Sequence, residues 1–270
     1  MRQYGPEIVG EDVWQRINAP GVPPTLKGRF PLLLKFLDAA KNLSVQVHPN
    51  DDLAAQLTPP DLGKSEAWYV MDAAPGATIY AGLKTGVTRE DFSRAVESGK
   101  TAEVLHSFQP RRGDCVFIPA GTIHAIGAGL LILEIQQASN TTWRVFDWNR
   151  VDTNGKGREL HIDQAVQAID FQRGPIQPEK PSADFLNAEN LITCNHFSMS
   201  RLQIAPGARP KFANIEKCKI MAVTKGQLLL CGASGDQPLD IGQTMLLPAH
   251  CRQALLQAIE PSELIVISVV

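Results

Sequence analysis

Short apolar or alternating segments, separated by Gly, Pro and Asp, run through most of this 270-residue sequence. Segments of this length bounded by turn residues predict β-strands, and many of them in one chain predict a sandwich or a barrel. We therefore expect an all-β-dominated fold. The predicted strands are residues 30–37, 43–48, 66–71, 77–80, 115–118, 130–136, 142–146, 197–204, 220–223, 227–231, 244–247 and 264–270.

Three segments predict helices instead. Residues 50–57 form a short helix that ends at a pair of prolines, and residues 162–169 carry apolar side chains at helical spacing. Between them, residues 88–99 begin with a capping box from Thr88 to Asp91 and end at a glycine. We therefore expect a few helices inserted among the strands.

One pattern occurs twice: a glycine, five further residues and then Pro-Ala, at residues 113–120 and again at residues 242–249. In each copy a glycine turn leads into a short apolar strand. The first copy continues to His124, whereas the second has no histidine at the matching position. The repetition predicts two related β-domains, of which only the first has a set of possible metal ligands.

Candidate metal ligands share one face of the predicted strand 43–48. Successive side chains of a strand point to opposite faces, so Gln46 and His48 lie together. Glu66 and His124 would supply a carboxylate and a second imidazole. Imidazole nitrogen and carboxylate oxygen, with room for water, are typical of an open catalytic zinc site rather than a closed structural one.

Composition excludes several classes of function. The formal net charge is −2 with acidic and basic residues mixed, which gives no footprint for nucleic acid or for a membrane surface. No apolar run approaches the ~20 residues that span a bilayer, and the first residues lack the apolar core of a secretory signal. Five scattered cysteines without a C-x-x-C pair predict free thiols, and hence a cytoplasmic location.

The motif G-x5-P-x-G-x2-H, formed by Gly113, Pro119, Gly121 and His124, resembles the second motif of the cupin family. The similarity extends to the type I mannose-6-phosphate isomerases, in a short form without their helical insertion. It is strong over residues 10–171. The segments that carry it are PLLLKFLD (31–38), LSVQVHP (43–49), GKSEAWY (63–69), GTIHAIG (121–127), LEIQQ (133–137) and TTWRVFD (141–147).

The resemblance implies two cupin-like β-sandwich or barrel (jelly-roll) domains with a few helices. We expect a catalytic cupin domain with the metal site over residues 1–155. A helix and a proline-rich linker would follow over residues 156–190. Residues 191–270 would form a degenerate, metal-free cupin-like domain.

The same resemblance implies a metal-dependent aldose–ketose isomerase that interconverts mannose 6-phosphate and fructose 6-phosphate through an enediol. One Zn²⁺ per chain would be bound by Gln46, His48, Glu66 and His124, and Arg144 would lie in the active site. The expected partner is a small sugar phosphate, and the sequence leaves the oligomeric state open.

Further residues complete the expected site. Lys64 shares a strand face with the proposed ligand Glu66, so we expect it in the same cavity with a catalytic role. Arg144 and Arg150 are candidates for holding the phosphate. Two residues that share a face, Glu134 and Gln136, could orient the ligands. The proton-transfer base stays open among Glu134, Asp147, Lys64 and a metal-bound water.

Three departures from the family leave other functions open. Trp143 stands where tyrosine is usual, Asn140 stands where aspartate is frequent, and no Trp-Gly-Gly segment precedes Gly10. They motivate the alternative of a non-catalytic sugar-phosphate-binding or regulatory cupin. A cupin oxygenase that uses iron is a third possibility.

Overall fold

The computed structural model describes residues 5–183, 188–213, 215–232 and 235–270. The chain forms two compact units. We call Leu32–Glu179 the central unit, and Met1–Pro31 together with Lys180–Val270 the split unit. This division groups residues 1–31 with the C-terminal part of the chain. The predicted assignment of a metal-binding and a metal-free domain stays a prediction.

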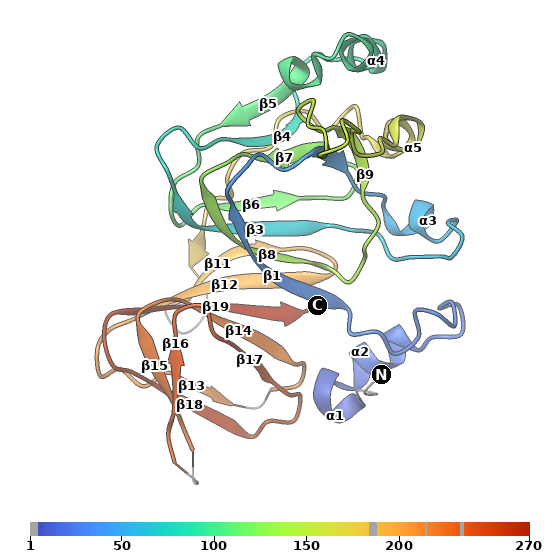
Figure 1. Cartoon of the computed structure of the whole chain (residues 1–270). Coiled ribbons are helices and arrows are strands. Elements are labelled where there is room, and N and C mark those ends of the chain that lie inside the picture. Colours follow the sequence, from blue (N-terminus) through green and yellow to red (C-terminus); the bar gives the residue numbers. More distant parts are fainter. Residues whose placement is uncertain (1–4, 184–187, 214, 233–234) are drawn as a thin grey trace. The chain divides into compact units, whose positions relative to one another are not determined.

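Two antiparallel sheets form the central unit (Figure 1). One has the strand order β1-β8-β3-β6, and the other has the order β5-β4-β7-β2-β9. The strands are β1 (Leu32–Ala39), β2 (Val45–Val47), β3 (Glu66–Ala73), β4 (Ile79–Leu83), β5 (Leu105–Phe108), β6 (Cys115–Ile118), β7 (His124–Ile126), β8 (Leu130–Gln137) and β9 (Trp143–Phe146). The all-β expectation is confirmed.

The helices of the central unit lie where the sequence patterns predict them. They are α3 (Asp51–Ala54), α4 (Arg89–Glu97) and α5 (Ile162–Ala168), with a 3₁₀ helix, η1 (Thr101–Val104), that was not predicted. At the start of α4 the Thr88 hydroxyl accepts from the Asp91 amide, and the Asp91 carboxylate accepts from the Thr88 amide. These two bonds satisfy amide donors that a helix start leaves open, so the predicted capping box is confirmed.

Apolar side chains on one face of β2 decide which face is turned toward the interior of the sandwich. Val45 and Val47 are fully buried in a cluster that includes Phe92 of α4 and Ala165 of α5. Figure 1 shows both helices on the side of the central unit formed by the five-stranded sheet. Because strand side chains alternate, covering the valines with helices turns Gln46 toward the interior of the sandwich.

The split unit also contains two sheets, with orders β10-β11-β12-β19-β14-β17 and β13-β18-β15-β16. A cluster of buried apolar residues, among them Phe212, Leu228, Leu256 and Leu264, forms its core. Its elements are α1 (Pro6–Val9), α2 (Glu11–Ile17), β10 (Ser182–Ala183), β11 (Ala188–Thr193), β12 (Phe197–Ile204), β13 (Lys211–Ala213), β14 (Lys219–Lys225), β15 (Gln227–Cys231), β16 (Gln237–Asp240), β17 (Thr244–Leu247), β18 (Gln253–Ala258) and β19 (Ser262–Val269). The two N-terminal helices were not predicted.

The repeated glycine pattern occupies equivalent places in the two units. Gly113 and Gly242 have φ values of 92° and 84°, a left-handed conformation that favours glycine, and lead into β6 and β17. Each of these strands is the edge of its sheet, next to β3 or β14. The pattern therefore marks the same structural position twice.

Two further observations concern the chain as a whole. Among the described helices, none has the length and apolar character that crossing a bilayer requires. All five cysteines are free thiols: Cys115 and Cys218 are buried, and the other three are partly buried.

Candidate metal centre

Three of the predicted ligands converge inside the central unit. His48 follows β2 directly, whereas Glu66 and His124 are the first residues of β3 and β7. Nε2 of His48 lies 3.5 Å from Oε2 of Glu66, and Nε2 of His124 lies 3.2 Å from Oε1. The three side chains are buried and offer ligand atoms within 4.8 Å of one another. The group could hold a metal ion.

Strand pairing explains how residues distant in sequence meet. Gln46 is the register partner of His124 on one side and of Arg144 on the other, so the three side chains form a row across β7, β2 and β9. In the facing sheet Glu66 is paired with Gln136. The two sheets pack face to face, which brings the carboxylate opposite the imidazoles.

The turn before His124 is tied to His48 by the backbone. The Gly121 amide donates to the His48 carbonyl over 2.8 Å. Gly121 has φ +85°, and a Cβ at this position would lie 3.0 Å from the Ala168 carbonyl oxygen. The motif glycine is thus required by both conformation and space, and it fixes the distance between the two histidines.

Hydrogen bonds at the outer ring nitrogens orient both imidazoles. Nδ1 of His48 lies 3.0 Å from the Thr141 carbonyl oxygen, and Nδ1 of His124 lies 2.8 Å from the Thr122 carbonyl oxygen. A carbonyl only accepts, so each Nδ1 carries the proton and each Nε2 presents a lone pair to the centre. This is the tautomer that a metal-ligating histidine uses.

The surroundings keep both histidines neutral and Glu66 ionised. Burial, with the nearby Lys64 ammonium, lowers the pKa of His48, and burial lowers the pKa of His124 to about 3. Burial acts to raise the pKa of Glu66, but Lys64, His48 and His124 together hold it well below its usual range. Neutral imidazoles and a carboxylate are the protonation states that metal binding requires.

Glu66 has a buried oxygen that a bound cation would satisfy. Its Oε1 is the one buried side-chain oxygen or nitrogen in the described part of the chain that has no hydrogen-bond partner. Leaving a buried charged atom unsatisfied costs free energy. Since the nearest imidazole nitrogens present lone pairs, a metal ion fits this oxygen better than any proton the site supplies.

The fourth predicted ligand also faces this centre. Nε2 of Gln46 lies 3.4 Å from Nε2 of His48 and 3.3 Å from Nε2 of His124. The amide nitrogen donates toward the two lone pairs, while Oε1 lies 3.4 Å from the Ser44 hydroxyl. Rotating the amide by a half turn would present its oxygen to a cation instead.

Lys64 lies against the candidate ligands. Its Nζ is 2.8 Å from Nε2 of His48 and forms an ion pair with Oε2 of Glu66. The Lys64 amide donates to the Pro49 carbonyl over 3.0 Å, which ties the start of β3 to the residue after His48. The structure places Lys64 beside Glu66, as the alternation of the strand predicts, whereas its catalytic role stays a prediction.

Arg144 and Arg150 lie near each other but make different contacts. Nη1 of Arg144 donates to the Glu159 carbonyl at 2.9 Å, and its Nε donates to the Ser44 hydroxyl at 3.3 Å. Arg150 forms an ion pair with Asp147. Arg144 therefore adjoins the Gln46 side of the centre, and Arg150 faces a neighbouring pocket.

Lys35 is a residue that the sequence analysis missed. Its Nζ donates to Oε1 of Glu134 at 2.8 Å and to Oε1 of Gln136 at 2.5 Å. Oε2 of Glu134 accepts from the Trp68 indole at 3.3 Å. Burial, with the charge of Glu66, raises the pKa of Glu134. The alternation of strand 31–38 could have placed Lys35 inside, but only strand pairing identifies its partners.

The split unit has a different residue where the central unit has its carboxylate. Ile118 and Leu247 hold the same place in the repeated glycine pattern, directly before its proline. Ile118 pairs with Glu66 in the central unit, whereas Leu247 pairs with Lys219 in the split unit. Lys219 donates to the Ser268 hydroxyl at 2.8 Å. An ammonium is not a metal ligand while it is charged, which supports the predicted metal-free copy.

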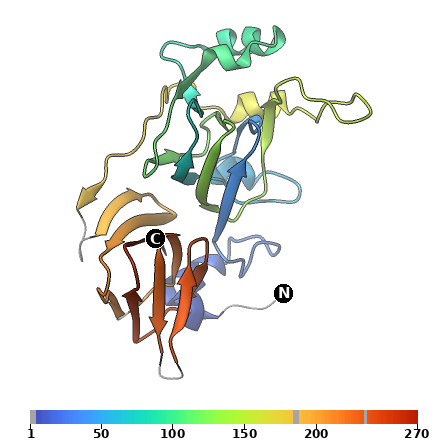
Figure 2. The same ribbon diagram turned by 60° about the vertical axis from the view of Figure 1, so that its left-hand side comes forward.

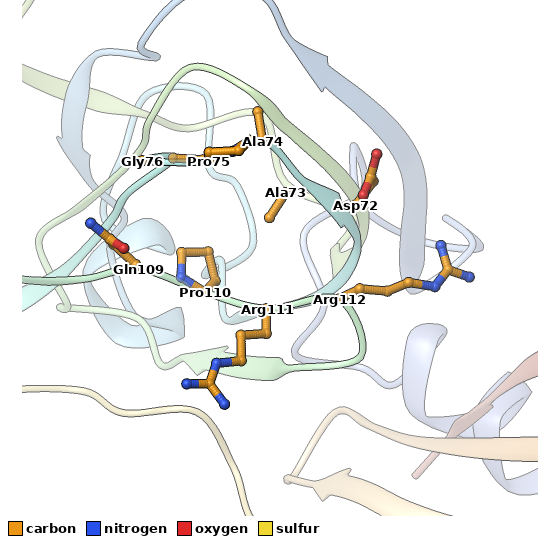
Figure 3. Close-up of a pocket in the computed structure, with 10 residues that line it drawn as sticks. Asp72, Ala73, Ala74, Pro75, Gly76, Gln109, Pro110, Arg111 and Arg112 are labelled. Atoms are coloured by element: carbon orange, nitrogen blue, oxygen red, sulfur yellow. The ribbon is translucent and has the colours of Figure 1, made fainter.

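Another pocket of the central unit, of about 380 Å³, lies away from these residues (Figure 3). It is lined by the β3–β4 turn at residues 72–77 and by residues 109–112. Figure 3 shows the side chains of Arg111 and Arg112 extending away from each other. The pocket contains none of the predicted site residues.

Comparison with known proteins identifies relatives. Residues 7–73 match the family model described as phosphomannose isomerase type I, catalytic domain. Mannose-6-phosphate isomerase ManA of Bacillus subtilis is 37% identical over 225 residues, covering 82% of this chain and 70% of that protein. Mannose-6-phosphate isomerase of Streptococcus mutans is 34% identical over 220 residues, covering 81% of this chain and 68% of that protein.

Solved structures agree with these relatives. The crystal structure of the mannose 6-phosphate isomerase from Bacillus subtilis matches with a TM-score of 0.81 at 31% identity, over 95% of this chain and 80% of that one. A putative mannosephosphate isomerase from Archaeoglobus fulgidus shares the fold, with a TM-score of 0.74 at 20% identity, over 98% and 76% of the two chains. Because ManA and the Streptococcus mutans isomerase are 37% and 34% identical to this chain over 70% and 68% of their own lengths, the chain belongs to the type I mannose-6-phosphate isomerase family.

Proposed function

We propose that this chain interconverts mannose 6-phosphate and fructose 6-phosphate with one zinc ion, held by Gln46, His48, Glu66 and His124. The observation that carries the proposal is the buried Oε1 of Glu66, which has no hydrogen-bond partner and lies 3.2 Å from the Nε2 lone pair of His124, while Nε2 of His48 lies 3.5 Å from Oε2 of the same carboxylate. The similarity to isomerases over most of the chain supports the reaction class.

The reaction moves a proton between C2 and C1 of the sugar and builds negative charge on an oxygen. A bound zinc ion supplies a Lewis acid for that charge. Lys64 adds a positive charge beside Glu66 and His48, and Arg144 adds one beside Gln46. Both cations would stabilise a negative charge that develops on a substrate oxygen at this centre.

Glu134 suits the role of proton-transfer base better than Asp147. Both carboxylate oxygens of Asp147 accept from arginines. These hydrogen bonds, chiefly those from Arg158, lower the pKa of Asp147 and make it the weaker base. Glu134 is buried on the strand next to Glu66, and burial raises its pKa, which makes it the stronger base. We therefore assign the base to Glu134, with Lys35 holding its carboxylate in place.

Zinc is the proposed metal, and iron is the competitor to test. Two histidines and a carboxylate are also the ligands of non-haem iron oxygenases. Metal analysis of protein made in medium that contains both metals separates the two. Tightly bound iron would contradict the proposal.

A coupled assay tests the function. Zinc-loaded protein should produce fructose 6-phosphate from mannose 6-phosphate, and a chelator should abolish this turnover. Glu134→Gln should keep zinc and lose exchange of the C2 proton with solvent. Binding of mannose 6-phosphate without any turnover by zinc-loaded protein would instead support a non-catalytic cupin, an alternative that no contact in the described residues favours. The predicted cytoplasmic location stays a prediction from the cysteine pattern.

A further inference from the structure

A second pocket of the central unit, of about 470 Å³, is lined by more basic than acidic side chains. Lys41, Arg150, Lys156 and Arg158 contribute four positive charges, against two negative charges from Asp147 and Asp152. The whole chain has a formal net charge of −2. An excess of positive charge in a pocket of a chain that is negative overall indicates a small anionic ligand.

Arg150 and Arg158 converge on one carboxylate. Nε of Arg158 donates to Oδ2 of Asp147 at 2.7 Å, and both arginines form ion pairs with Oδ1. Nη1 of Arg150 also donates to the Asn42 carbonyl at 2.7 Å, and its Nε donates to the Asp147 carbonyl at 3.2 Å. The buried Asp147 thus holds two guanidinium groups side by side before any ligand arrives.

These arginines keep unused donors at the pocket. A guanidinium has five N–H donors, and the contacts above leave two on Arg150 and three on Arg158. A phosphate monoester has three terminal oxygens that accept such bonds, often two from one guanidinium. Since Asp147 already fixes both side chains, little conformational entropy is lost when the anion binds.

The pocket is connected to the candidate metal centre by a series of polar contacts. Ser44 lies 3.4 Å from Oε1 of Gln46, and Arg144 donates to Ser44 and to the Glu159 carbonyl. Glu159 directly follows Arg158. These contacts connect the segment that carries Arg158 to the residues beside the candidate ligand Gln46.

The segment that carries Lys156 and Arg158 is an ordered hairpin. Val151 pairs with Gly157, and the Asp152 carboxylate accepts from the amides of Asn154 and Lys156 at 2.8 and 2.9 Å. Figure 2 shows this segment projecting from the central unit between β9 and α5. Neither Lys156 nor Lys41 has a carboxylate partner in the described part of the chain.

We propose that this pocket binds the phosphate group of the sugar-phosphate substrate, with Arg158 as a specificity-determining residue and Asp147 as the positioning residue that aligns Arg150 and Arg158. The proposal rests on the isomerase function proposed above. It assigns to the hairpin between β9 and α5 the selection of phosphorylated over unphosphorylated sugar.

The test combines steady-state kinetics on mannose 6-phosphate with calorimetric measurement of inorganic phosphate binding to zinc-loaded protein. Arg158→Ala should raise KM for mannose 6-phosphate by about 10- to 100-fold with kcat changed only a few-fold, as expected for the loss of charged hydrogen bonds to a non-reacting group. Phosphate affinity should fall by a similar factor. Arg158→Lys should restore part of both, and Asp147→Asn should weaken both while circular dichroism stays unchanged.

A matched control is available on α4. Arg94 pairs with Asp91 three residues earlier, as Arg150 pairs with Asp147, but it lies outside the pocket. Arg94→Ala should leave KM and phosphate affinity unchanged. Lys156→Ala, on the exposed hairpin, provides a second variant should Arg158→Ala fail to fold, and it should weaken phosphate binding several-fold.

The outcomes separate this proposal from the proposed function. Unchanged phosphate affinity in Arg158→Ala and Lys156→Ala would overturn the pocket even if the enzyme isomerises mannose 6-phosphate. Phosphate that inhibits without competing with the substrate would show a separate anion site and also overturn it. Absence of turnover with phosphate binding lost in Arg158→Ala would overturn the isomerase function and leave the anion pocket standing.

Discussion

Nε2 of His124 lies 3.2 Å from Oε1 of Glu66, and neither atom has a proton to share with the other. The ring proton of His124 is on Nδ1, where the Thr122 carbonyl accepts it. An ionised carboxylate and an imidazole lone pair repel each other at this distance in a buried site. The protein maintains this arrangement through strand pairing and the Gly121 turn, so the free energy gained on binding a cation is large.

Removal of one ligand side chain should therefore abolish metal binding while the protein still folds. We expect His48→Ala to lose zinc and turnover together, with an affinity loss greater than the roughly 10- to 100-fold that follows removal of an outer hydrogen-bond partner. Metal content after dialysis and the rate of fructose 6-phosphate formation measure the two effects. His106→Ala, whose ring contacts Gln177 outside the centre, is the control and should keep its zinc. Full zinc occupancy in His48→Ala would show that the ligand set is wrong.

The stability of the chelated protein should fall as the pH is lowered from about 6.5 toward 5. Burial lowers the pKa of His124 to about 3, whereas the unfolded chain titrates near 6.5. In this window the unfolded state binds a proton that the folded state does not, so the free energy of unfolding rises with pH. Each such histidine contributes at most about 1.4 kcal/mol per pH unit.

Urea unfolding at several pH values between 5 and 7, with chelator present, measures this slope. His124→Gln removes one titrating ring and should make the slope smaller, whereas His106→Gln should leave it as in the parent protein. An identical slope in His124→Gln would mean that His124 is not kept neutral by burial.

Much of the centre is readable from the sequence because local rules place its ligands. Alternation along residues 43–48 turns Gln46 and His48 to one face, and the glycine pattern before His124 defines a turn and a strand. The structure shortens β2 to Val45–Val47, yet His48 still points inward. Short-range periodicity thus predicts which side chains share a face.

Long-range pairings are what the sequence does not reveal. Lys35 meets Glu134 only because β1 and β8 pair in that register, and Arg158 meets Asp147 across a hairpin without periodic pattern. The helices α1 and α2 also escape prediction, because at 4 and 7 residues they are too short to show a clear apolar repeat. In each case a contact made on folding, rather than a local preference, decides the structure.

Arg144→Ala should keep zinc and lose activity. The guanidinium contacts Ser44 and the Glu159 carbonyl rather than the candidate ligands, so its removal leaves the metal centre intact. We expect kcat to fall by about 100-fold or more, the usual cost of losing one charged donor that stabilises an oxyanion. Metal analysis and steady-state kinetics on the same preparation provide the measurement. Loss of zinc from this variant would show that Arg144 supports the fold of the site instead.

Lys64→Met should bind zinc more tightly and turn over more slowly. The Lys64 ammonium forms an ion pair with Oε2 of Glu66 and lies 2.8 Å from Nε2 of His48, so it competes with a cation for both. Methionine has a similar length and no charge, which removes the competition and the repulsion between ammonium and metal. Competition with a chromophoric chelator measures the affinity, and the coupled assay measures the rate.

Lys84→Met, on an exposed lysine that donates to the Glu103 carbonyl, is the control and should change neither the zinc affinity nor the rate. Weaker zinc binding in Lys64→Met would mean that the ammonium orients the ligands instead of opposing the metal, and an unchanged rate would remove Lys64 from the catalytic residues.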